Sequence, residues 1–204
     1  MAEHNQDARL PGPGSDDITQ LILDDHERFR RAFARLDDLR ATGQTSPNEL
    51  SRVWDPLAEL LDVHAIAEEE IFYPQLLRKG ADGQDETLDA IGDHNEIRDG
   101  VHDAATQPVG SEAWWDAVGR ARGANDEHMA EEERDALADF RLHAAIGLRE
   151  SLGRRFRQFV AEHMGAGDLN TSDKDPREYV QANKPRSSRT PADYSLGIGS
   201  LKGR

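Results

Sequence analysis

Two short segments of the chain place a histidine and a glutamate four residues apart. The segment "HAIAEEEIFYP" (64–74) contains His64 and Glu68, and "HMAEEERDAL" (128–137) contains His128 and Glu132. Residues four apart lie on the same face of a helix, one turn from each other. Each segment, if helical, therefore offers an imidazole nitrogen and a carboxylate oxygen to one cation, and a carboxylate can bridge two metal ions.

Two more histidines fall on apolar helix faces. His26 lies between Ile22 and Phe29, and His94 lies three residues from both Ile91 and Ile97. A single histidine in such a place is usually a hydrogen-bonded core residue, and runs of glutamates are usually solvated. Four inward histidines and two inward carboxylates, however, are costly to bury unless a cation binds them. The joint pattern predicts a metal centre with six ligands: His26, His64, Glu68, His94, His128 and Glu132.

The elements that position these residues are predicted by apolar residues recurring every three to four positions. Helix one is predicted to begin near Ser15, and helix two to cover about 47–79. Helix three ends before Pro108, and helix four begins near Ser111. A last helical segment covers about 146–163, and no strand pattern competes. The fold class is therefore all-α: an antiparallel four-helix bundle with an additional C-terminal helix and an irregular tail.

The composition changes near both ends of the chain. Residues 1–14 are polar with two prolines and are predicted to be a flexible leader, whereas 15–164 form the helical bundle. Residues 165–204 have no periodicity and are predicted to be an irregular or disordered tail. The leader has no apolar core of the kind found in secretory signals, so the expected location is cytoplasmic.

Composition also excludes several classes of function. The chain has no cysteine, which excludes disulfides, thiolate zinc sites, iron–sulfur clusters and a cysteine nucleophile. Its net charge is −15, and residues 1–164 carry 18 basic against 35 acidic side chains. Such a surface repels phosphate backbones and anionic membranes, so no nucleic-acid or membrane partner is expected. The oligomeric state cannot be read from the sequence.

Spacing excludes two alternative kinds of metal site. Ferritin-like carboxylate bundles use Glu-x-x-His, but the residues three before His64, His94 and His128 are not glutamates. A zincin needs His-Glu-x-x-His, and alanine follows His64.

The remaining pattern resembles the histidine–histidine–glutamate (HHE) branch of the hemerythrin family. The motifs that carry the resemblance are the isolated His26, "HAIAEEEIFYP", "DHNEIRD" and "HMAEEE", and it covers about residues 15–163. The resemblance implies a four-helix bundle that holds two non-heme iron ions. By that resemblance His26 and His64 bind one iron, and His94 and His128 bind the other. Glu68 and Glu132 then bridge the pair, together with an oxo or hydroxo group.

One position departs from the oxygen-carrying members, which have a second histidine one turn after the helix-three ligand. Here that residue is Arg98, which cannot ligate. One iron is then expected to lack a protein ligand unless His102, Glu69, Glu131 or a tyrosine reaches it. The other histidines, His4, His143 and His163, are interpreted as surface residues.

These features lead to three hypotheses for function. The first is a di-iron protein that binds dioxygen, nitric oxide or peroxide in a stress response or in sensing. Its open coordination favours peroxide or nitric oxide chemistry over pure oxygen carriage. The second is a metal-dependent interaction or iron/oxygen-sensing module without turnover. The third is a structural site for a single iron or zinc ion.

Overall fold

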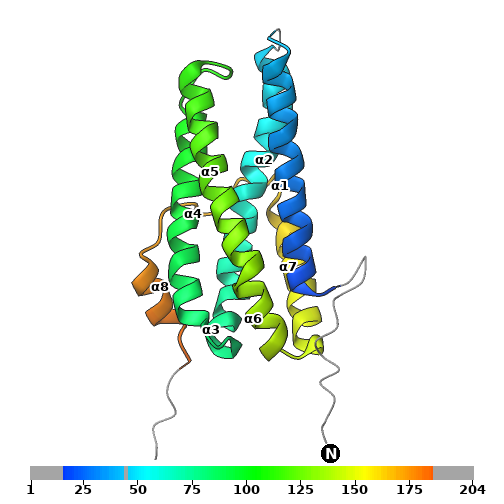
Figure 1. Cartoon of the computed structure of the whole chain (residues 1–204), viewed down its shortest axis with the longest axis vertical. Helices are drawn as coiled ribbons and strands as arrows, with labels where there is room; N and C mark the ends of the chain where they lie inside the picture. The colour runs from blue at the N-terminus through cyan, green and yellow to red at the C-terminus, as the bar shows by residue number, and fades with distance from the viewer. Residues whose placement is uncertain (1–15, 44–45, 186–204) are drawn as a thin grey trace, which may run out of the picture.

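The computed structural model describes residues 16–43 and 46–185. The predicted leader and residues 186–204 of the predicted tail lie outside this range. The described residues form helices and no strands (Figure 1). The elements are α1 (Ile18–Ala41), α2 (Pro47–Ala67), a π-helical turn η2 (Glu68–Phe72), α3 (Tyr73–Lys79), α4 (Gly83–Ala105), α5 (Glu112–Arg134), α6 (Ala136–His143), α7 (Ile146–His163) and α8 (Pro176–Asn183).

Four long helices, α1, α2, α4 and α5, run alternately up and down side by side (Figure 1). Helix α7 packs against α1 and α2, and the short α8 packs on the outer side of α4. The all-α bundle with an additional C-terminal helix is therefore confirmed. No helix in the described part of the chain is long and apolar enough to cross a membrane.

The starts of the bundle helices are fixed by side-chain caps. Asp17 accepts a hydrogen bond from the backbone N–H of Thr19 at 3.0 Å, which begins α1. Ser46 and Glu49 form a reciprocal capping box at the start of α2, and Ser111 caps α5. Such caps satisfy N–H groups that the helix leaves unpaired and contribute about 1 kcal/mol each.

The buried side chains form two apolar clusters with a polar layer between them. One cluster, which includes Phe33, Trp54 and Trp114, lies toward the α1–α2 and α4–α5 turns. The other, which includes Phe72 and Phe140, lies toward the opposite end of the bundle. The sequence places the candidate ligands at the boundary: along α1, for example, His26 follows Ile22 of one cluster and precedes Phe29 of the other. Apolar packing therefore covers this polar layer on the two sides that face the ends of the bundle.

Helices α4 and α5 approach each other closely at one glycine. A Cβ atom built on Gly100 would lie 2.6 Å from the backbone nitrogen of Ala121. No side chain fits there without displacing α5. Gly100 therefore sets the distance between the two helices that carry His94 and His128.

The structure differs from the sequence expectation in three places. The predicted helix over 47–79 is interrupted by the π turn Glu68–Phe72, and the predicted fourth helix is broken at Asp135 into α5 and α6. Within the tail expected to be irregular, residues 176–183 form α8, which Asp175 caps. A helix this short gives too little periodicity to be recognised, and its stability comes from docking on α4.

Candidate metal centre

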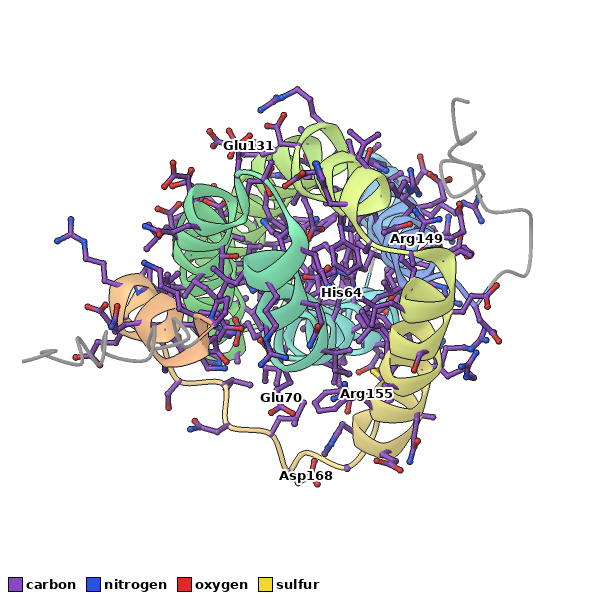
Figure 2. The ribbon with its side chains drawn as sticks, turned by 90° about the horizontal axis from the view of Figure 1, so that it is seen from below. His64, Glu70, Glu131, Arg149, Arg155 and Asp168 are labelled. Carbon is purple, nitrogen blue, oxygen red and sulfur yellow. The ribbon has the colours of Figure 1, made fainter. Side chains whose placement is uncertain are left out.

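The structure brings all six residues predicted as ligands into one buried layer. Each of the four long helices contributes at least one of them, because each has its histidine on the stripe that faces the bundle axis. None of the six is more than 3% exposed. Figure 2, a view along the bundle, shows His64 among the central helices, whereas Glu70 lies on the outside.

Glu68 lies between the two halves of this layer. Its Oε1 is 3.0 Å from His64 Nε2, and its Oε2 is 3.3 Å from His94 Nε2. One ligand atom from each of His26, His64 and Glu68 lies within 4.8 Å of the others, and the same holds for Glu68, His94 and His128. Glu68 is the member that both groups share, which is the position of a bridging carboxylate.

Glu132 faces the same space from α5. Its Oε2 is 3.3 Å from His26 Nε2 and 4.0 Å from His128 Nε2. Its Oε1 accepts a hydrogen bond of 3.0 Å from the hydroxyl of the fully buried Tyr73. Glu132 thus also lies between one histidine of each half.

The donor atoms of this layer fit a cation better than they fit one another. Buried side-chain atoms without a hydrogen-bond partner among the described residues include Nε2 of His26 and His64, both oxygens of Glu68 and Oε2 of Glu132. These atoms form ion pairs of 3.0–3.3 Å within the layer without forming hydrogen bonds, and a buried polar atom that lacks a hydrogen bond costs about 1–3 kcal/mol. Imidazole and carboxylate donors in this number suit iron or zinc, so the residues present fit the metal that the resemblance implies.

A ring of outer carboxylates orients the four histidines. Each Nδ1 atom faces a carboxylate from another part of the bundle, while Nε2 faces the centre. The pairs are His64–Asp25 at 3.1 Å, His94–Glu69 at 2.9 Å, His128–Asp93 at 3.4 Å and His26–Glu133 at 2.9 Å. Such partners fix the ring orientation and raise the basicity of the nitrogen that binds metal.

The π turn allows two consecutive glutamates to face inward. The backbone N–H of Tyr73 bonds to the carbonyl of Glu68, five residues earlier, which widens the turn. Glu68 then points to the centre, while Glu69 reaches Nδ1 of His94. Both side chains are buried, whereas Glu70 is exposed. The usual interpretation of "EEE" as a solvated face holds here only for its third residue.

Two positively charged side chains, Arg98 and Lys174, also hold Glu69 in place. Arg98, 1% exposed, donates to its Oε1 at 2.5 Å, and Lys174 pairs with its Oε2. Tyr179 of α8 donates a hydrogen bond to the backbone carbonyl of Glu69. Asn95 fixes the segment before α8 through both backbone groups of Lys174. The segment after α7, labelled at Asp168 in Figure 2, passes around the outside of the bundle to make these contacts.

The carboxylates also raise the pKa of His26, His64 and His94. Burial lowers the pKa of His64, but Glu68 and Asp25 outweigh it and raise that pKa to about 10. Burial likewise opposes protonation of His26 and His94, yet their carboxylates raise the pKa of both. A metal ion must displace these protons, so its binding strengthens as the pH rises.

Each alternative ligand named for the position of Arg98 either is exposed or already has other partners. Glu69 is occupied by His94, Arg98 and Lys174, and His102 lies 3.1 Å from Thr171 on the surface. Glu131 is exposed, and the nearby tyrosine, Tyr73, binds Glu132. Of the expected surface histidines, His143 is exposed, His163 is partly exposed and His4 lies outside the described residues.

Sequence reasoning missed the outer carboxylates, although a signal was present. Asp25, Glu69, Asp93 and Glu133 are each the immediate neighbour of a predicted ligand. Each of these carboxylates faces a histidine that lies on a different helix from its neighbour in the sequence. The sequence alone does not show this pairing, because it depends on how the helices pack.

Comparison with known families agrees with this arrangement. The model of the hemerythrin HHE cation-binding domain matches residues 17–140, more than half of the chain. No curated protein and no solved structure matches the chain. The matched region ends within α6, so α7, the segment that carries Lys174 and α8 lie outside it.

Proposed function

Because the chain belongs to the hemerythrin HHE cation-binding family, we propose that its six inward residues hold two iron ions. The observation that carries this proposal is the position of Glu68, whose two oxygens face His64 and His94 from opposite halves of the layer. The proposed ligands are His26 and His64 for one ion and His94 and His128 for the other, with Glu68 and Glu132 shared.

The proposed activity is binding and redox chemistry of dioxygen, nitric oxide or peroxide. A bound iron pair supplies electrons and coordination positions for such small ligands. The chain supplies the rest. The ring of outer carboxylates holds the four imidazoles in position, and the two apolar clusters cover the layer toward both ends of the bundle.

The environment of Arg98 favours chemistry over reversible carriage. Its guanidinium is directed to Glu69 and Asn95. Helix α4 therefore offers the centre one imidazole, from His94, which leaves more room for an exogenous ligand.

The test is metal analysis of the aerobically purified protein together with its ultraviolet–visible spectrum. We expect two irons per chain and the charge-transfer bands of an oxygen-bridged pair. Peroxide or nitric oxide should shift these bands and be consumed. One metal ion per chain, or zinc in place of iron, would contradict the di-iron proposal.

A sensing module without turnover is the second candidate, and one feature favours it. Glu69 touches His94 on one side and Lys174 on the other, so a change at His94 is coupled directly to the segment before α8. If the loaded protein binds nitric oxide without consuming it, and if protection of α8 from proteolysis depends on metal, this candidate is preferred.

A further inference from the structure

A cavity of about 520 Å³ opens between the first turns of α4 and the junction of α5 and α6. Two of its lining residues, His128 and Glu132, belong to the candidate metal centre and are 3% exposed. A third, Asp93, is the outer carboxylate that faces Nδ1 of His128. The cavity therefore extends from the surface to one half of the centre.

The wall of this cavity is strongly acidic. Nine of its lining residues are aspartate or glutamate, and Arg134 is the only lysine or arginine among the described residues that line it. Arg134 is already paired with Asp135 at 2.7 Å. A concave wall with one sign of charge concentrates ions of the opposite sign and raises their association rate.

Two carboxylates along the cavity have a buried oxygen that forms no hydrogen bond with the described residues. Glu132 Oε2, at the buried end, has no hydrogen-bond partner among the described residues, and neither has Glu86 Oε2, nearer the start of α4. Burial and the charges of Asp139 and Asp82 raise the pKa of Glu86 to about 7. A cation bound in the cavity would relieve the repulsion between Glu86 and these two aspartates.

The other large cavity near the centre has a different character. It measures about 380 Å³, and its wall mixes Asp24 and Asp25 with Arg28 and Arg157. None of the six candidate ligands lines it. Among the described cavities, the acidic one therefore combines a predominantly negative wall with direct contact to the ligands.

We propose that the acidic cavity is the path by which a hydrated divalent cation reaches the buried centre. The carboxylates at its mouth attract the ion, and His128 and Glu132 are the first ligands that it meets. This inference rests on the proposed function insofar as the centre must bind metal.

The test compares cobalt uptake by metal-free full-length proteins, with Co²⁺ as the probe because its visible spectrum reports binding. The cavity variant Asp85→Asn/Asp89→Asn/Glu131→Gln changes three exposed wall residues that are not ligands. The control variant Asp38→Asn/Asp55→Asn/Asp116→Asn changes the net charge equally at exposed positions outside the cavity. Circular dichroism checks that both are folded.

At low ionic strength we expect the cavity variant to load Co²⁺ about tenfold more slowly than the wild type, with weaker salt dependence. Its final stoichiometry and spectrum should match the wild type, and the control should load at the wild-type rate. Equal loading rates in the two variants would refute the path and leave the metal centre intact. A lower final stoichiometry in the cavity variant would show a binding site in the wall instead of a path. If the wild type itself takes up no Co²⁺, the proposed function fails first.

Discussion

His94 and Arg98, one turn apart on α4, donate to the same oxygen of Glu69. The distances to Oε1 are 2.9 Å from His94 Nδ1 and 2.5 Å from Arg98 Nη2. Arg98, which stands where the resemblance to oxygen-carrying hemerythrins would place a histidine, therefore acts on the candidate centre indirectly, through the carboxylate that orients His94. Burial would raise the pKa of Glu69, but His94 and Arg98 lower it to about 2.

This relationship predicts that Glu69→Gln weakens both stability and metal binding. The substitution leaves the buried guanidinium of Arg98 without a charged partner, which costs about 3 kcal/mol or more. Loss of an outer carboxylate typically lowers metal affinity about 10- to 100-fold. Denaturant unfolding of the metal-free protein and a metal titration measure the two effects. Glu70→Gln is the matched control, because Glu70 is the exposed neighbour; similar losses in both variants would argue against the network.

The ligand assignment is tested by His64→Ala, Glu132→Ala and Glu70→Ala. The first two remove side chains that are 3% exposed and face the centre, whereas Glu70 points outward. We expect iron content to fall by at least half in the first two and to stay at the wild-type level in the third. The measurement is metal per folded chain after gel filtration. Equal iron in all three proteins would contradict the assignment.

Particular residues show which features of the fold and the candidate site can be predicted from the sequence. His26 and His94 were placed inward because each is flanked by apolar residues at helical spacing, and that periodicity is local. The π turn at Glu68–Phe72 is not periodic, so the burial of Glu69 could not be predicted. The partners of Arg98 and Lys174 depend on contacts between residues 29 and 105 positions apart along the chain. Such contacts are set by the packing of helices and not by any local pattern.

Gly100 and Gly92 on α4 allow a controlled test of the close contact between α4 and α5. At Gly100 a Cβ atom would lie 2.6 Å from Ala121 N, so Gly100→Ala should destabilise the fold by about 1–3 kcal/mol. At Gly92 nothing lies within 4 Å of the same atom, so Gly92→Ala should stabilise α4 by about 0.5–1 kcal/mol. Denaturant unfolding measures whether each substitution raises or lowers the free energy of unfolding. Destabilisation by both substitutions would show that helix propensity and close packing do not explain the difference.

Glu86 predicts a pH dependence of the metal-free protein. Its pKa in the fold is about 7, against an ordinary value of 4.5, because burial and Asp139 disfavour its charge. A carboxyl group with a raised pKa destabilises the fold when ionised, so this cost develops as the pH rises from 4.5 to 7 and is absent at lower pH. Glu86→Gln should therefore raise the Tm at pH 8 more than at pH 4.

Glu96→Gln is the control for this experiment, since Glu96 is exposed on the same helix and does not line the acidic cavity. Its Tm difference from the wild type should change less between the two pH values than that of Glu86→Gln. A Glu86→Gln difference that changes with pH no more than the Glu96→Gln difference would mean that the carboxylates around Glu86 do not repel it.

The last prediction concerns the segment after α7, which belongs to the tail that the sequence predicts to be irregular or disordered. The structure changes that expectation. Truncation after Gly167 removes Lys174 and Tyr179, which hold Glu69, and Val180, which is 3% exposed against the bundle. The helices with the candidate ligands end at Arg134, so the bundle should still fold. Burial of one valine side chain contributes about 1.5 kcal/mol or more, so the Tm should fall by several degrees.

Metal affinity should fall in the same truncated protein, by about tenfold, because Glu69 then relies on Arg98 alone to balance its charge outside the centre. A chain that ends at Pro185 is the control, since it keeps α8 and every described contact to Glu69. Lys174→Met in the full chain separates the charge from the packing: it should lower metal affinity while α8 stays docked through Tyr179. If the chains ending at Gly167 and Pro185 bind metal equally tightly, α8 only covers α4, and Arg98 is sufficient to fix Glu69 against His94.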